Sequence, residues 1–145
     1  MLVKEIMTRN VITVSPDTSL KEVSKILKEK RISGVPVVDN GGNIVGIITI
    51  TDILAIIRQI YEWQALERST AGVNISELLG VEWLNKKVNE VMRKNVYTLD
   101  ENKSINEVMR LMFTHQIHTI PIVNDNKLVG VVGKRDLVFF IFKMG

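Results

Sequence analysis

Short apolar stretches and helix-like patterns follow one another along this chain in an order that occurs twice. Residues 10–14 and 95–99 are rich in Val, Ile and Thr, which predicts two short strands. Ser19 and Ser104 each precede a Glu by three residues, a capping-box spacing that predicts a helix start. Apolar residues then recur at helical spacing, Leu20, Val23, Ile26 and Leu27 in the first copy and Ile105, Val108, Met109 and Met112 in the second.

Each copy ends with two apolar strands and a second helix. A proline lies within the first of these strands in both copies, Pro36 and Pro121, which predicts a position at a strand's beginning or at a sheet edge. Tight turns then separate the two strands. The predicted elements are strands 32–38 and 44–49 with a helix from about Asp52 in the first copy, and strands 117–123 and 128–132 with a helix from about Asp136 in the second.

The two copies align along their whole length. Their offset is 85 residues (88 − 3) before the tight turn and 84 residues (130 − 46) after it, because the second turn is one residue shorter. Duplication therefore describes the chain better than one irregular domain. We predict an α+β fold of two β-α-β-β-α repeats, residues 1–60 and 88–145.

Residues 61–87 form an insert with no counterpart in either repeat. Its start is expected to extend the helix from Asp52, with a break at 69–72 and a short helix within 75–84. Both tryptophans, Trp63 and Trp83, lie here. We therefore expect the insert to pack against the repeats or a partner subunit.

The composition favours a folded protein that is not embedded in a membrane. Hydrophobic residues make up 46% of the 145 residues, enough for a core, and no apolar run approaches the length needed to cross a bilayer. The N-terminus has no signal-peptide pattern and the chain has no cysteine, so we expect a cytoplasmic location without disulfides. The net charge of +3 comes with scattered basic residues, which favours small anionic ligands over nucleic acid.

Three segments and their second-copy counterparts resemble a tandem pair of cystathionine-beta-synthase (CBS) domains. They read VKEIMT from Val3, GVPVVD from Gly34 and VGIITITD from Val45. The resemblance covers nearly the whole chain apart from the insert. It implies a pseudo-twofold module with two clefts that bind an adenosine-containing ligand, association into homodimers, and a regulatory rather than an enzymatic role.

Asp52 and Asp136 match the ribose-binding Asp of this family. A carboxylate has enough acceptor sites for two adjacent hydroxyl groups, and the start of a helix offers free amides to a nearby phosphate. Thr49 matches a hydroxyl position of the family, whereas the second copy has Gly133 there. We therefore expect two unequal sites.

The resemblance also implies which residues contact the rest of the ligand. Lys134 and Arg135 would supply positive charge in the second copy, and His118 resembles a polar residue that reaches a phosphate in adenylate-sensing members such as the gamma subunit of AMP-activated kinase. The adenine is expected between apolar segments, Ile12, Thr13, Gly34, Val35 and Pro36 in one repeat and Tyr97, Thr98, Thr119, Ile120 and Pro121 in the other.

Several alternatives stay open at this stage. Asp52 also makes an ordinary helix start, where an acidic residue favours the helix dipole whether or not a ligand binds. His115 and His118 have no thiolate or third ligand beside them, so we expect no metal. AMP ranks ahead of ATP, but ADP, S-adenosylmethionine and a dinucleotide share the adenosine half, and no cofactor is expected to be required. The alternative function is a ligand-free oligomerisation adaptor that acts through protein partners; nucleic-acid binding and catalysis rank lower.

Overall fold

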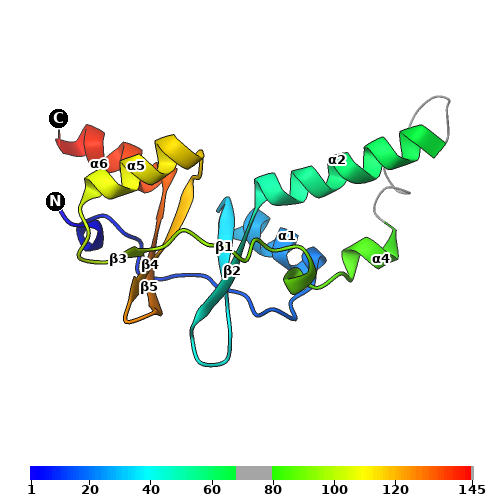
Figure 1. Ribbon diagram of the computed structural model, residues 1–145, viewed down its shortest axis with the longest axis horizontal. Helices are drawn as coiled ribbons and strands as arrows, with labels where there is room; N and C mark the ends of the chain where they lie inside the picture. The colour runs from blue at the N-terminus through cyan, green and yellow to red at the C-terminus, as the bar shows by residue number, and fades with distance from the viewer. Residues whose placement is uncertain (68–79, 145) are drawn as a thin grey trace.

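A computed structural model describes residues 1–67 and 80–144 of the chain. Its elements form two halves, each with its own sheet and helices (Figure 1), so the predicted α+β class with two repeats is confirmed. In chain order they are the 3-10 helix η1 (Val3–Glu5), α1 (Leu20–Lys30), β1 (Gly34–Val38), β2 (Ile44–Thr49), α2 (Ile50–Glu67), α4 (Val81–Leu84), the 3-10 helix η2 (Val88–Glu90), β3 (Leu99–Asp100), α5 (Ile105–His115), β4 (Thr119–Asn124), β5 (Lys127–Gly133) and α6 (Lys134–Met144).

Each half contains an antiparallel hairpin, β1 with β2 and β4 with β5, and β3 adds a parallel strand to the second hairpin. The strands predicted at 10–14 and 95–99 are wrong for most of their length. Val14 forms a single bridge with Val37, and β3 begins only at Leu99. Several of the other residues in these segments line the clefts described below and do not pair with a neighbouring strand.

Both strand prolines lie where one side of the strand has at most a short pairing. β1 is an edge strand of a two-stranded sheet, as predicted for Pro36, but Pro121 lies in β4, the central strand of a three-stranded sheet. β3 pairs with β4 only at Ile122 and Val123, so Pro121 has a strand neighbour on one side alone. A residue without an N–H is tolerated there because no second ladder needs one.

Helices α1 and α5 occupy matching places, but only α1 has the predicted side-chain cap. The Ser19 hydroxyl oxygen accepts a hydrogen bond from the backbone N–H three residues later at 3.1 Å. Ser104 makes no such side-chain bond. Both helices end at a left-handed residue that is not glycine, Arg31 (φ 54°) and Gln116 (φ 55°). These two residues turn the chain toward the strand that follows.

The two hydrophobic cores do not follow the repeat boundaries. Val3, from the first repeat, is fully buried in the core of the second half, and its N–H donates to the Lys103 carbonyl oxygen at 2.8 Å. Val88, from the second repeat, is fully buried in the core of the first half, and its N–H donates to the Thr18 carbonyl oxygen at 2.8 Å. The start of each repeat therefore crosses to the opposite half (Figure 1). Each core depends on apolar side chains from both repeats.

Two glycines let these exchanged segments lie close against the hairpins. A Cβ on Gly46 would come within 3.0 Å of the Arg93 carbonyl oxygen, and one on Gly130 within 3.1 Å of the Thr8 carbonyl oxygen. Backbone bridges join the same segments to β2 and β5. The glycines thus hold Thr8 and Arg93 at equivalent positions, one in each half.

The described part of the insert adds to the first half. α2 continues to Glu67, in line with the prediction for the start of the insert. The break expected at 69–72 lies outside the described residues, and only α4 is described of the helix expected within 75–84. Trp83 packs against the core of the first half, whereas Trp63 is 60% exposed. No helix in the part of the chain that the structure describes is long and apolar enough to cross a bilayer.

Candidate functional site

Two clefts are each lined by residues of both repeats. We call the larger, of about 470 Å³, the Asp136 cleft, and the smaller, of about 300 Å³, the Arg93 cleft. They share one wall, made of Ser33, Ile50, Thr119 and Lys134. The other lining residues are Thr8, Asn10, Ile12, Leu27, Arg31, Ile32, Gly34, Pro36, Val131, Gly133, Arg135 and Asp136 in the Asp136 cleft, and Ile47, Thr49, Thr51, Arg93, Asn95, Val96, Tyr97, Gln116, Ile117 and His118 in the Arg93 cleft.

The repeat offset relates the residues of one cleft to those of the other. Thr8 and Arg93 are 85 positions apart (93 − 8), and Thr49 and Gly133 are 84 positions apart (133 − 49). The two clefts therefore share a backbone frame and differ in the side chains attached to it.

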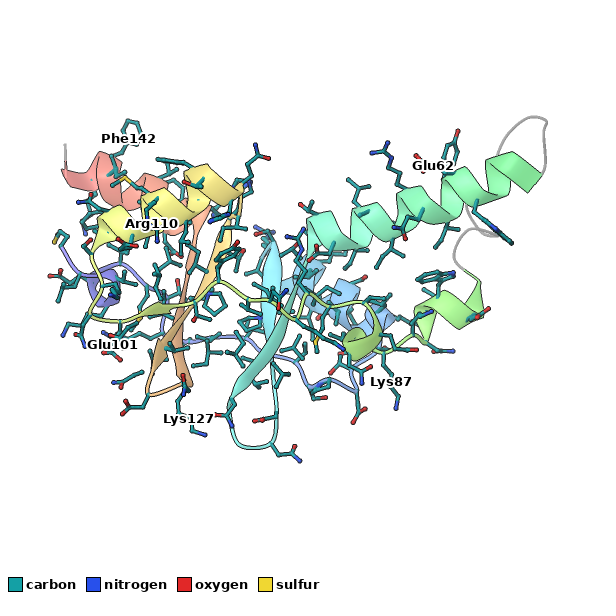
Figure 2. The ribbon with its side chains drawn as sticks, viewed as in Figure 1. Glu62, Lys87, Glu101, Arg110, Lys127 and Phe142 are labelled. Atoms are coloured by element: carbon teal, nitrogen blue, oxygen red, sulfur yellow. The ribbon has the colours of Figure 1, made fainter. Side chains whose placement is uncertain are left out.

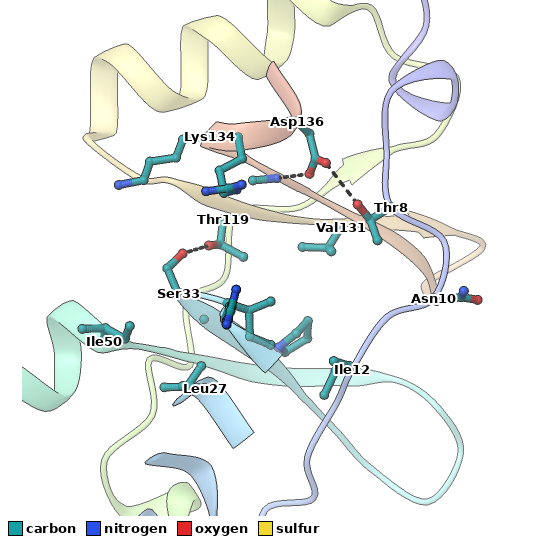
Figure 3. Close-up of a pocket in the computed structure, with 16 residues that line it drawn as sticks. Thr8, Asn10, Ile12, Leu27, Ser33, Ile50, Thr119, Val131, Lys134 and Asp136 are labelled. Carbon is teal, nitrogen blue, oxygen red and sulfur yellow. Dashed lines mark hydrogen bonds between the residues drawn. The ribbon is translucent and has the colours of Figure 1, made fainter. Parts of the chain in front are cut away.

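Asp136 lies in the first turn of α6 and lines its cleft (Figure 3). Its Oδ2 accepts a hydrogen bond from the Gly133 N–H at 2.7 Å, and its Oδ1 accepts one from the Thr8 hydroxyl at 3.1 Å. The residue is half-buried. Both donors are neutral, and each carboxylate oxygen keeps an acceptor site for a ligand hydroxyl.

The equivalent carboxylate, Asp52 in the first turn of α2, is buried and has different partners. Its Oδ2 accepts hydrogen bonds from the N–H and the hydroxyl of Thr49, at 2.9 and 3.0 Å. Its Oδ1 lies 2.6 Å from Nε of Arg93, so the two side chains form an ion pair. Arg93 lines a cleft, whereas Asp52 is not among the lining residues of either. In the first half the arginine therefore stands between the carboxylate and the cleft.

Positive charge dominates the Asp136 cleft. Arg31, Lys134 and Arg135 line it together with a single carboxylate, that of Asp136. The guanidinium carbon of Arg135 lies 5.2 Å from the centroid of the Phe139 ring, a cation–π distance that holds this side chain along α6. A ligand that carries both hydroxyl groups and an anionic group would match this distribution of charge.

The predicted ligand-binding residues divide into three groups. Ile12, Gly34, Pro36, Thr119, Lys134, Arg135 and Asp136 line the Asp136 cleft; Thr49, Tyr97 and His118, with Thr119 and Lys134, line the Arg93 cleft; Thr13, Val35, Asp52, Thr98, Ile120 and Pro121 are not among the lining residues. Val35 and Ile120 are fully buried in the two cores. Side chains alternate between the two faces of a strand, so the neighbour of a residue that lines a cleft points into the core.

The structure groups these residues across the repeats. Asp136 of the second repeat shares a cleft with Ile12 and Gly34 of the first. Tyr97 and His118 of the second repeat share the other cleft with Thr49 of the first. The sequence interpretation assigned the adenine contacts repeat by repeat, because the crossing of the chain between the halves leaves no mark on the residue pattern.

Sequence reasoning did not select several residues that line the clefts. For Thr8 and Arg93 a signal existed, since they are equivalent in the repeat alignment and differ in charge. Arg31 and Gln116 are also equivalent in the alignment (116 − 31 = 85) and also differ in charge, but a polar residue at the end of a helix is typical of an ordinary surface position. Only the left-handed turn at both residues brings them to the clefts.

The two histidines have separate surroundings. His115 stacks on Tyr97, with ring centroids 4.3 Å apart and an angle of 23° between the planes, while His118 lines the Arg93 cleft. Among residues 1–67 and 80–144, no three His, Cys, Asp or Glu side chains come together as a metal site would require.

Two half-domains with exchanged first segments and a pair of equivalent clefts define a tandem-repeat module. The family profile described as "CBS domain" matches residues 3–59 and 88–143, which together make up most of the chain. This chain therefore belongs to the CBS domain family.

Individual relatives agree with this assignment. Inosine-5'-monophosphate dehydrogenase of Methanocaldococcus jannaschii is 34% identical over 135 residues, 92% of this chain and 22% of the relative. The CBS domain-containing protein YhcV of Bacillus subtilis is 32% identical, over 93% of this chain and 81% of YhcV. The solved CBS domain pair of protein MJ0100, in complex with 5'-methylthioadenosine and S-adenosyl-L-methionine, is 29% identical over 100% of this chain and 98% of that one, with a TM-score of 0.75. The chain spans less than half the length of the first four curated relatives that it matches.

Proposed function

We propose that this CBS pair is a regulatory module, not an enzyme, and that it binds an adenosine-containing ligand in the Asp136 cleft. AMP is the leading candidate, ahead of ADP and ATP. The observation that carries the proposal is the half-buried Asp136 carboxylate, which lines a cleft of about 470 Å³ together with three cationic side chains.

The chemistry of the cleft supports each part of such a ligand. The two oxygens of Asp136 can accept both hydroxyl groups of a ribose. Lys134 and Arg135, at the start of α6, lie where a phosphate would also meet free backbone N–H groups and the positive end of the helix. Ile12 and Pro36 give the cleft an apolar side for a base.

The relatives point in the same direction. The CBS pair of MJ0100 was solved with two adenosine-containing ligands and is 29% identical to this chain. A ligand regulates only through a difference in affinity between two states. We therefore expect binding in the Asp136 cleft, whose wall is shared with the Arg93 cleft, to change how the two halves pack.

The test is a calorimetric titration with AMP of the wild-type protein, Asp136→Asn and Asp125→Asn. Asp136→Asn keeps the size of the side chain but removes the charge, and it should weaken AMP binding by about tenfold or more. Asp125→Asn is the matched control, since it removes a carboxylate in the β4–β5 turn that lines neither cleft. An AMP titration curve that is the same for Asp136→Asn and the wild type, in both stoichiometry and affinity, or no binding of AMP by the wild type, would contradict the proposed site.

A second candidate function is an oligomerisation adaptor, and exposed apolar side chains on two helices favour it. Leu54 on α2 is 62% exposed, and Phe139 and Phe142 on α6 are 60% and 80% exposed. Phe142 projects outward from α6 (Figure 2). Such side chains are expected to be covered in a homodimer. Sedimentation of the wild type and Phe142→Ser, with and without AMP, separates an adaptor that dimerises without ligand from a ligand-dependent module.

A further inference from the structure

The side chains that contact Asp52 and Asp136 differ in charge between the two halves. Thr8 donates a neutral hydroxyl to Asp136, whereas Arg93, its equivalent, donates a charged guanidinium N–H to Asp52. The contact in the first half is also the shorter, 2.6 Å against 3.1 Å. At this position the second half thus presents an anionic carboxylate to its cleft, beside the cations described above, and the first half presents a cationic guanidinium.

Burial strengthens this difference. The Asp52 side chain is only 9% exposed, so an unpaired charge there would be costly, and Arg93 supplies the compensating charge. The Arg93 side chain is itself 57% exposed and lines the cleft. It can therefore leave Asp52 without moving out of a packed core.

We propose that Arg93 makes the Arg93 cleft selective for ligands that carry a phosphate, while the Asp136 cleft also accepts an uncharged nucleoside. This inference rests on the proposed function. For a ribose to reach Asp52, Arg93 must give up its partner. A nucleotide compensates, because its phosphate can take the guanidinium in a bidentate pair while its hydroxyls take the carboxylate. Adenosine has no anionic group that could pair with Arg93 in place of the Asp52 carboxylate.

In the Asp136 cleft no ion pair has to break before a ribose can bind, because Thr8 is uncharged. A ribose hydroxyl can join or replace one neutral hydrogen bond to Asp136 without leaving a cation unpaired. The wild-type protein should therefore bind one adenosine, in the Asp136 cleft, and two molecules of AMP.

The experiment exchanges the two residues and counts bound ligand by isothermal titration with adenosine and with AMP. Arg93→Thr copies the second half into the first, and it should bind two adenosines per chain in place of one. Thr8→Arg copies the first half into the second, and it should weaken adenosine binding by about tenfold to a hundredfold, the range for a hydrogen bond to a charged group, while AMP still binds. Adding Asp136→Asn to Arg93→Thr should return the adenosine count to one, which locates the new site in the Arg93 cleft.

Circular dichroism and thermal unfolding show whether each variant folds. Arg93→Thr leaves Asp52 without its counter-charge and should lower the stability, but the backbone bridges to Ile47 and both hydrogen bonds from Thr49 to Asp52 remain, so the variant is expected to keep the fold. One adenosine bound by both the wild type and a folded Arg93→Thr protein would overturn the inference and leave the proposed function intact, as would two adenosines bound by the wild type. Adenosine binding that survives Thr8→Arg unchanged overturns it independently of Arg93→Thr. Binding of neither ligand by the wild type overturns the proposed function and the inference with it.

Discussion

Asp52 and Asp136 occupy equivalent places in the two halves of one chain, yet they are tied into their surroundings to different degrees. Asp52 is held by an ion pair and by two hydrogen bonds from Thr49, and it is buried. Asp136 accepts one hydroxyl and one backbone N–H and lines its cleft. A duplicated backbone therefore fixes where a carboxylate lies, while a few neighbouring side chains decide whether it serves the structure or is available to a ligand.

The largest expected difference between the two halves is in the stability lost when each carboxylate is removed. Asp52→Ala leaves the Arg93 guanidinium and both Thr49 donors without their acceptor, so we expect it to lower the free energy of unfolding by about 2–3 kcal/mol. The exposure of Arg93 keeps the loss below that of a fully buried pair. Asp136→Ala should cost less than about 1 kcal/mol, since both of its partners are neutral and the Thr8 hydroxyl is exposed. Urea denaturation followed by circular dichroism measures both, and equal losses would contradict the difference in role.

A smaller change in stability is expected when Gly133 of the second half is given the hydroxyl that Thr49 has in the first. A Cβ on Gly133 would lie 3.7 Å from Asp136 Oδ2 and 3.7 Å from the His118 carbonyl oxygen, so Gly133→Thr has room. Its hydroxyl should bond Asp136 as Thr49 bonds Asp52 and, with the lost flexibility of glycine, raise the free energy of unfolding by about 0.5–1.5 kcal/mol.

The same substitution should weaken adenosine binding several-fold, because the new hydroxyl uses an acceptor site on Asp136. Gly133→Ala is the control that changes chain flexibility without adding a donor. A threonine variant that is no more stable than the alanine variant would show that the hydrogen bond does not form.

The smallest expected difference in stability comes from the two hairpin turns, and it depends on pH. Asp39 in the first half corresponds to Asn124 in the second (124 − 39 = 85). The Asn43 N–H, with smaller contributions from the Asn43 side chain, the Gly41 N–H and the charge of Lys127, lowers the pKa of Asp39 below its ordinary value of 3.8, although burial opposes this. Because the folded state has the lower pKa, ionised Asp39 stabilises the fold above pH 3.8, and this contribution is lost as the pH falls through the lowered pKa.

Asp39→Asn should therefore be less stable than the wild type at neutral pH, with a difference that shrinks as the pH falls below 3.8. Unfolding curves measured from neutral to acid pH test this. Asn124→Ser in the second hairpin is the control, and its difference from the wild type should not depend on the pKa of a carboxylate at this turn. A constant difference for Asp39→Asn down to low pH would refute the prediction.

The order of the elements was predictable from the sequence because repeated local signals mark it. The capping pattern at Ser19, the apolar strand around Pro36 and the glycine turn at 40–42 each have a cause within a few neighbouring residues. The strand at 10–14 was mispredicted because strand pairing depends on a partner edge that local propensity does not report. Ser104 carried the same capping signal as Ser19, yet its side chain makes no bond.

The candidate site was predictable only in part for a related reason. Asp136, Lys134 and Arg135 lie together at the start of one helix, so a single sequence motif predicted all three as site residues. Their cleft is completed by residues such as Thr8 and Arg31, which are more than a hundred positions away and reach the site through the exchange of segments between the halves. Single-sequence reasoning finds such residues only when the two repeats are compared position by position.

The exchanged segments also set the order in which the chain can complete its cores during synthesis. Val88 belongs to the core of the first half, so that core cannot close until the chain has grown past the insert. Val3 and Met7 are synthesised before the rest of the core that receives them, which is built from residues between Leu99 and Leu137. A ribosome that makes the chain from its N-terminus therefore releases these two apolar side chains long before their partners exist.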